Sequence, residues 1–131
     1  METQEKLSFK RTACPVAAAL DIVGDKWTLV IIRTMFAGAR RYGDLQKAPE
    51  QIPTNILASR LKELEVNGLV VKRAYQQRPV RHEYLLTQRG ADLLPVLQAL
   101  ARWSAMHICN TWAPPAWFWE KAPADFVGHG E

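Results

Sequence analysis

The sequence lacks most of the features that mark secreted, membrane-spanning or disulfide-linked proteins. It has only two cysteines in 131 residues, Cys14 and Cys109, which are too few for a disulfide framework. No apolar run approaches the roughly 20 residues needed to span a bilayer, and the polar N-terminus has no apolar stretch typical of a secretory signal. These absences predict a cytoplasmic protein with no membrane partner, in which both cysteines remain thiols.

Motifs of common enzyme classes are also missing. There is no glycine-rich phosphate loop, no Gly-x-Ser-x-Gly and no His-Glu-x-x-His. Asp21, Asp25 and Asp44 fall near predicted helix ends or turns, where carboxylates are normally solvated. His107 and Cys109 match no zinc-ligand spacing. We therefore predict that the protein is not an enzyme and that it has no metal site and no cofactor.

Positive charge is concentrated in the middle of the chain. The net charge is +4, but between Arg40 and Arg89 ten Lys or Arg stand against five Asp or Glu, so this segment carries +5 and the rest −1. A basic middle with nearly neutral ends is typical of a surface that binds a polyanion. On charge alone, a solvated surface that is merely basic is an equal alternative.

Hydrophobic periodicity predicts an arm and then four helices in the first half of the chain. Residues 1–13 are polar, without a period, and are expected to form a flexible arm. The second helix is apolar over most of its circumference, which predicts that it is the central buried helix. Thr54 is expected to cap the fourth helix, and glycines to end the first, second and fourth. The four helices are predicted over residues 14–24, 27–37, 42–48 and 55–67.

After Gly68 the hydrophobic period changes from that of a helix to that of a strand. Residues 69–75 and 81–86 are predicted to be two strands joined by a turn at 76–79. Thr87 is expected to cap a last long helix with a kink at Pro95. A tail over residues 113–131 is rich in tryptophan and proline. The order of elements predicts a mainly α fold with a small β-hairpin, namely a winged helix-turn-helix.

The fourth predicted helix has the layout of a DNA-reading helix. Leu57, Leu61 and Leu64 are spaced to face the core. The opposite face of its N-terminal half is polar and free of acids, which suits a helix that enters the major groove by its N-terminal end. An ordinary amphipathic surface helix is the alternative for this segment in isolation. The candidate base-contacting residues are Thr54, Asn55, Ser59 and, nearer the flank, Arg60.

The predicted hairpin favours the DNA-binding interpretation. Arg78 lies in its turn, and Arg73 and Arg81 lie on its arms. Core packing does not require cations at a hairpin tip, whereas a wing that lies along a phosphate backbone does. Arg40 and Arg41, just before the third helix, are further candidates for phosphate contacts.

Several motifs occur in an order that identifies a family. They are CPVAAALDIVGDKWTLVIIRTMFAGARRYGDL, then TNILASRLKELEVNGLV, then RPVRHEYLLTQRGADLLPVLQALARW. Over residues 14–112 the chain resembles the HxlR-type bacterial winged helix-turn-helix regulators. The resemblance implies a homodimer joined by the first and last helices, which binds a palindromic operator of double-stranded DNA. It implies contacts at Thr54, Asn55, Ser59, Arg60, Arg78 and Arg81. The family usually has Phe where this chain has Tyr42.

Cys14 is the candidate for reactive chemistry. A thiolate at a helix N-terminus is favoured by the helix dipole, and Lys10 and Arg11 are close in sequence. In some members of the family a cysteine at this position senses oxidants or electrophiles, which makes Cys14 a redox-sensor candidate. A half-buried helix-capping cysteine without a signalling role is the alternative.

The C-terminal tail is a second region that could receive a regulatory signal. Its aromatic residues are expected either to line a pocket for a small aromatic effector or, as the preferred hypothesis, to pack over the dimer partner. These residues are Trp112, Trp117, Phe118 and Trp119.

The sequence thus predicts a sequence-specific DNA-binding transcriptional regulator, with repression as the expected mode and a response to oxidants or electrophiles through Cys14 as a hypothesis. One alternative is a winged-helix regulator that responds to a small aromatic ligand. Another is a winged helix that docks onto protein instead of DNA. The salt dependence of binding separates DNA from protein as the partner, because only DNA releases condensed counterions.

Overall fold

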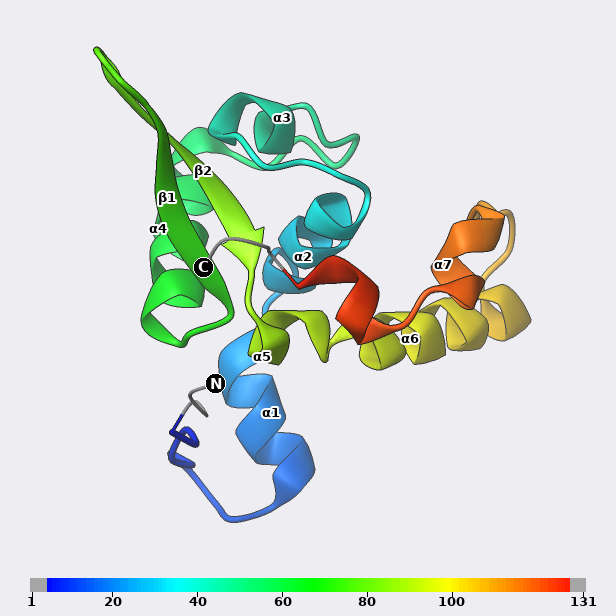
Figure 1. Ribbon diagram of the computed structural model, residues 1–131. Helices are drawn as coiled ribbons and strands as arrows, with labels where there is room; N and C mark the ends of the chain where they lie inside the picture. The colour runs from blue at the N-terminus through cyan, green and yellow to red at the C-terminus, as the bar shows by residue number, and fades with distance from the viewer. Residues whose placement is uncertain (1–4, 128–131) are drawn as a thin grey trace.

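Helices precede and follow a single β-hairpin in the chain (Figure 1). The computed structural model describes residues 5–127 of the 131. Residues 5–13 contain no helix or strand. The elements are α1 (Pro15–Val23), α2 (Thr28–Phe36), α3 (Tyr42–Gln46), α4 (Thr54–Val66), β1 (Val70–Gln77), β2 (Val80–Leu86), α5 (Gln88–Ala91), α6 (Leu94–His107), α7 (Ala116–Glu120) and the 3-10 helix η1 (Pro123–Phe126).

Helix α2 lies at the centre of the core, as its apolar circumference predicts. Ile31 and Ile32 are fully buried, and Met35 and Phe36 nearly so. Helix α4 turns its three periodic leucines inward, which confirms the predicted core face. Full burial of such side chains contributes roughly 1.5–3 kcal/mol each, so this stripe sets the roll of α4 about its own axis. The three leucines are Leu57, Leu61 and Leu64, each at most 2% exposed.

Helix ends agree with the predictions except at the start of α4, and Gly24 caps the C-terminus of α1 as expected. Gly38 and Gly68 follow α2 and α4 with positive φ, as expected for terminating glycines. Gly24 instead has φ −81°, and a Cβ there would stand 2.3 Å from the carbonyl oxygen of Leu20. Glycine is therefore required at this position for close approach and not for a left-handed turn. The predicted cap Thr54 is wrong, because α4 already begins at Thr54 and no side chain caps it.

The hairpin is longer than predicted and bends. The two antiparallel strands keep regular register from Val70–Leu86 up to Ala74–His82. The register then shifts, and Tyr75 is an extra residue that faces no partner position on β2. Such a bulge bends the strand and increases its twist, so it sets the direction of the hairpin tip. In Figure 1 this tip projects well beyond the helices.

The predicted last helix is two helices. Thr87 caps the short α5 as predicted: its hydroxyl accepts a hydrogen bond from the amide of Gly90 and donates one to the carbonyl of Gly68 at 2.6 Å. The chain then turns at residues 92–93, and α6 begins with Pro95 in its first turn. Proline fits a first turn because its missing N–H has no intrahelical acceptor there. The expected kink is thus a complete break.

The tail packs on its own chain. Phe118 of α7 is 7% exposed, and its carbonyl accepts a hydrogen bond from the Gln98 side chain at 2.8 Å. Phe126 of η1 meets Phe36 edge to face, with ring centroids 4.8 Å apart, and Trp117 packs against the same core cluster. The preferred expectation that these tail aromatics pack on a partner subunit is therefore wrong for Phe118 and Trp117. Of the four aromatic residues considered for the tail, Trp112 and Trp119 are exposed.

Helices α3 and α4, joined by a short turn and followed at once by the hairpin, form a winged helix-turn-helix (Figure 1). Helix α1 lies at one end of this unit, and α6 carries the chain away from it before the tail returns. No helix among residues 5–127 is long and apolar enough to cross a membrane.

If the docked tail is part of the folded unit, Phe118→Ala will lower the free energy of unfolding by about 2–4 kcal/mol, because it leaves a cavity beside α6. Trp112→Ala is the matched control, since that side chain is 79% exposed; it will change stability by less than about 1 kcal/mol. Urea unfolding followed by circular dichroism measures both. Equal effects of the two substitutions would contradict a docked tail.

Candidate nucleic-acid interface

The turn between α3 and α4 is tied to the central helix. Both terminal nitrogens of Arg33, on α2, donate to the carboxylate of Glu50, at 2.6 and 2.8 Å. These hydrogen bonds lower the pKa of Glu50 below its usual value. Gln51 follows with φ 57°, a left-handed conformation that reverses the chain. The ion pair therefore holds the turn, and with it the start of α4, against the core.

A second tie joins α3 to the first residue of α4. The Tyr42 hydroxyl donates a hydrogen bond to the carbonyl oxygen of Thr54 at 2.9 Å. A phenylalanine at position 42 has no hydroxyl and cannot make this bond. This contact helps to place the N-terminus of α4. The sequence pattern around Tyr42 does not indicate this role.

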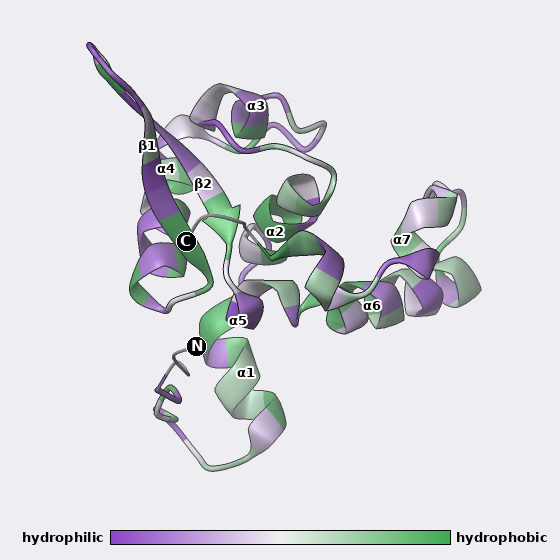
Figure 2. Cartoon of the chain, in the orientation of Figure 1, coloured by the Kyte–Doolittle hydropathy of each residue, from purple (hydrophilic) through white to green (hydrophobic). Residues whose placement is uncertain are grey.

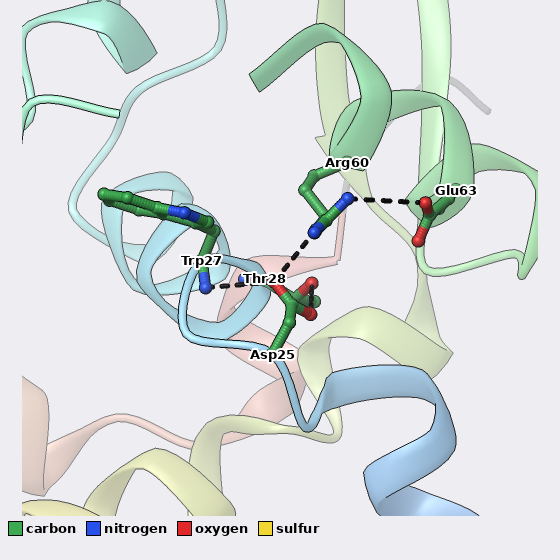
Figure 3. A network of polar contacts seen from close by, with 5 residues as sticks. All are labelled: Asp25, Trp27, Thr28, Arg60 and Glu63. Atoms are coloured by element: carbon green, nitrogen blue, oxygen red, sulfur yellow. Dashed lines mark hydrogen bonds and ion pairs between the residues drawn. The ribbon is translucent and has the colours of Figure 1, made fainter. Parts of the chain in front are cut away.

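A third tie links the middle of α4 to the start of α2 (Figure 3). The Asp25 carboxylate accepts hydrogen bonds from the amides of Trp27 and Thr28, both at 3.0 Å, and from the Thr28 hydroxyl. Arg60 Nε donates to the same carboxylate at 2.9 Å, and Arg60 Nη1 lies 3.5 Å from Glu63. Burial alone would raise the pKa of Asp25, but these hydrogen bonds outweigh it and lower the pKa to about 2.

The exposed face of α4 carries the predicted polar residues. Asn55 and Ser59 are exposed on the side opposite the buried leucines, and Lys62 continues that face. Thr54 is exposed at the first position of the helix. No side chain among the described residues caps the N-terminus of α4. Its first backbone N–H groups are therefore open to solvent or to an anion such as a phosphate. This surface offers hydroxyl, amide and backbone donors without a carboxylate at its N-terminal end.

Arg60 differs from the other candidate residues. Its side chain is 23% exposed and is held between Asp25 and Glu63. A guanidinium engaged in this way orients α4 relative to α2. The structure thus separates Arg60 from the exposed trio Thr54, Asn55 and Ser59, a distinction that helical spacing does not reveal.

The hairpin tip is exposed and free of acids. Arg78 and Arg81 are exposed, and the Gln76 side chain donates to the carbonyls of Arg78 and Pro79 at 3.4 and 3.2 Å, which closes the turn. Figure 2 shows hydrophilic colour along much of the hairpin. A narrow cationic projection of this kind suits a polyanion surface.

The hairpin is tied to the segment that enters α3. The Arg41 guanidinium lies over the ring of Tyr75, 4.0 Å from its centroid, so the bulge residue of β1 contacts the start of α3. The carbonyl of Arg40 accepts the amide of Tyr84 at 2.6 Å. Glu83 pairs with Arg73 at 3.3 Å and more loosely with Arg40 at 3.9 Å. Hairpin and helix-turn-helix are therefore positioned as one unit.

The two cysteines are exposed free thiols. Cys14 occupies the N-cap position of α1, as expected, but it is not half-buried. Arg11, a cation expected near the thiol, instead forms an ion pair with Asp21 at 2.6 Å. Among residues 5–127, no group of three or more His, Cys, Asp or Glu could hold a metal ion.

The chain is similar to a family of DNA-binding regulators. The model of the HxlR-like helix-turn-helix family matches residues 22–111. The uncharacterized HTH-type transcriptional regulator Mb3122 of Mycobacterium bovis is 40% identical over 109 residues, which are 83% of this chain and 68% of that protein.

Solved structures share the fold. The candidate transcription factor PA1607 is 36% identical, with a TM-score of 0.68 over 79% of this chain and 70% of that one. The redox regulator HypR, in its oxidized form, is 32% identical, with a TM-score of 0.65 over 72% of this chain and 97% of its own. The region matched by the family model, residues 22–111, includes the whole helix-turn-helix and hairpin.

The lowered pKa of Asp25 predicts a specific pH dependence. Because the folded pKa lies below the usual 3.8, the ionised carboxylate stabilises the fold above about pH 5, and this stability is lost as the pH falls toward 2. Wild type should therefore lose about 1–2 kcal/mol more than Asp25→Asn between pH 6 and 2.5, a value discounted for solvent screening.

Urea unfolding across this pH range measures the difference. Asp44→Asn, which changes an exposed acid on α3, is the matched control and should keep the wild-type pH dependence. Parallel pH profiles for wild type and Asp25→Asn would show that Asp25 does not hold the two helices together.

Proposed function

The chain belongs to the HxlR-like helix-turn-helix family of transcriptional regulators, and we propose that it recognises a palindromic operator as a homodimer and represses transcription there. The observation that carries this proposal is the pairing of an exposed polar face, free of acids in the N-terminal half of α4, with a hairpin tip whose charged side chains are all cations. Helix and hairpin are tied together through Arg41 and Tyr75. They therefore meet a DNA duplex as one rigid surface.

Helix α4 is the proposed reader of base sequence. Asn55 is suited to bind an adenine edge through its amide, and the Thr54 and Ser59 hydroxyls suit either donor or acceptor groups. All three side chains are exposed near the N-terminal end of the helix, which is the end that enters the major groove in helix-turn-helix proteins. We assign Arg60 a positioning role, because its guanidinium is bound to Asp25.

The hairpin is the proposed phosphate-binding wing. Arg78 and Arg81 are exposed cations on its projecting end, and Arg41 lies where the bulge residue Tyr75 meets the start of α3. Contacts of this kind contribute affinity with little sequence preference, since every base pair has the same phosphates. A steep loss of affinity with added salt follows from this assignment, whereas a winged helix that docks onto protein would show a shallow one.

Exposed apolar side chains on α1 and α6 support the proposed homodimer. Val16 and Leu20 of α1 are 67% and 52% exposed, and Leu100, Trp103 and Met106 of α6 are 48%, 59% and 76% exposed. Figure 2 shows α1 as largely hydrophobic although it lies at the outside of the unit. Exposed apolar side chains in such number mark a surface that a partner covers. A second copy of the chain, joined through the same two helices, is the partner that the family resemblance implies.

Cys14 is the proposed sensor of oxidants or electrophiles. Its thiol is exposed at the start of α1, a helix assigned to the dimer interface. Oxidation there would change the relation between the two subunits and hence the spacing of their recognition helices. The similarity to HypR, a redox regulator 32% identical to this chain, supports this assignment.

Substitutions in the wing and in the helix should have different consequences. Arg78→Ala will weaken binding to all DNA sequences and reduce the slope of log affinity against log salt by about 1, because one phosphate contact is lost. Asn55→Ala will instead change the preference among operator variants by about 1–3 kcal/mol. Fluorescence anisotropy with DNA from upstream of the protein's own gene, over a salt series, measures both.

Lys121→Ala is the matched control for charge, since this exposed cation lies in the tail after α7. It should leave the salt slope unchanged. A wild-type slope for Arg78→Ala, or an unchanged operator preference for Asn55→Ala, would remove that residue from the interface.

The two exposed cysteines provide a controlled test of the sensor. Treatment with hydrogen peroxide should change the DNA affinity of wild type by about tenfold or more, a usual size for coupling between two sites. Cys109→Ser should respond as wild type does, and Cys14→Ser should not respond. An equal response of Cys14→Ser and wild type would return Cys14 to a structural role.

A further inference from the structure

A cavity lies between the tail, the central helix and the hairpin. Its volume is about 210 Å³. Four segments far apart in the sequence form it: the end of α2, residues 38–40, residues 84–86 of β2 and residues 125–127. In Figure 1 the tail returns from α6 and places η1 beside α2, on the way to β2. The matched family region ends at residue 111, so one wall of this cavity is made by residues outside it.

Apolar and aromatic side chains form part of the cavity wall, beside polar groups. Met35, Phe36 and Leu85 contribute to it, and Phe126 closes it from the tail. Phe126 meets Phe36 edge to face, with an angle of 84° between the rings. The two rings are already in contact with each other, so a further planar ring can pack only beside this pair. A volume below the usual range for drug-sized ligands restricts the occupant to about a single ring.

Arg40 gives the rim of the cavity a cation for an anionic substituent. The Arg40 guanidinium is 57% exposed and lies 3.9 Å from Glu83, while Arg73 lies closer to the same carboxylate at 3.3 Å. Arg40 is therefore only weakly engaged. The opposing charge on the rim, Asp125, accepts the amide of Ala122 at 2.8 Å within its own turn. At the Arg40 side of the rim, a carboxylate is thus favoured over an ammonium group.

We propose that this cavity binds a small aromatic monocarboxylate and that the bound molecule alters DNA affinity. The ring would pack beside the Phe36–Phe126 pair, and the carboxylate would pair with Arg40. The second half of this inference rests on the proposed function, whereas binding itself does not.

The position of the cavity explains how occupancy reaches the DNA-binding surface. Residues 38–40 lead directly into α3, and the Arg40 carbonyl is hydrogen-bonded to the amide of Tyr84 at the base of the wing. A ligand here contacts both segments at once. A bound ligand therefore changes the position of the wing relative to the helix-turn-helix. Simultaneous contact with the DNA groove and the DNA backbone depends on this relative position.

Isothermal titration of the DNA-free full-length protein tests the site, with benzoate as the probe and benzylamine as the same ring with the opposite charge. Benzoate should bind one molecule per chain with a dissociation constant below about 1 mM, as expected for a ligand of this size. Benzylamine should bind at least tenfold more weakly. Absence of saturable benzoate binding, or stronger binding of benzylamine, would overturn the proposal.

Paired variants locate the site. Ala39→Leu adds bulk at a lining position and should weaken benzoate binding at least tenfold, whereas Ala37→Leu, an exposed position that is not part of the lining, should retain it. Arg40→Gln should remove the preference for benzoate over benzylamine. Thermal unfolding verifies that each variant folds. If Ala39→Leu does not fold, Phe126→Ala, which opens the wall of the cavity formed by the tail, replaces it. Unchanged binding in the lining variants would place benzoate elsewhere and contradict the site.

The coupling is tested with DNA, at constant ionic strength, by measuring affinity with and without saturating benzoate. A change of about fivefold or more is expected for wild type and none for Ala39→Leu. Benzoate binding without a change in DNA affinity would overturn the regulatory role alone. Lack of DNA binding by the ligand-free and the benzoate-bound protein would instead refute the proposed function and leave the binding result intact.

Discussion

The placement of the recognition helix depends on the Asp25 carboxylate. This one group accepts the first amides of α2 and the guanidinium of Arg60, so it fixes the start of the central helix and the middle of α4 to the same point (Figure 3). Breaking one partner of such a pair leaves the other charge without compensation, which costs more than the pair itself contributes. The buried leucines set the roll of α4, and Asp25 sets its position along α2.

The other ties extend this placement to the rest of the interface. Arg33 and Glu50 hold the turn before α4, and the Tyr42 hydroxyl holds the first residue of the helix. Arg41, stacked on the bulge residue Tyr75, joins the wing to α3. Because each contact links two elements, the polar face of α4 and the cationic tip are pre-arranged before DNA is met. Pre-arrangement of this kind reduces the ordering cost of binding.

Local sequence patterns predicted most of the helices and strands. The features that these patterns did not predict depend on contacts between residues far apart in the sequence. The leucine spacing of α4 and the glycines that end α2 and α4 depend on neighbours within a few residues, so the sequence reveals them. Arg60 and Asp25 lie 35 positions apart, so helical spacing, which places Arg60 at the flank of the polar face, does not reveal their ion pair. The docking of Phe118 and the break before α6 likewise depend on the packed core. The exposure of the polar face of α4 was predictable, because it is the complement of the leucine stripe.

Selection of binding sites from a random pool of double-stranded DNA by the wild-type protein, followed by hydroxyl-radical footprinting, tests the central claim most directly. The account predicts enrichment of a palindrome whose two half-sites lie about 10 base pairs, or a multiple of this distance, apart. Protection should extend from each half-site to the flanking backbone that the wing reaches. Enrichment of no sequence, or of a single half-site with one continuous block of protection, would contradict a paired helix-and-wing reader.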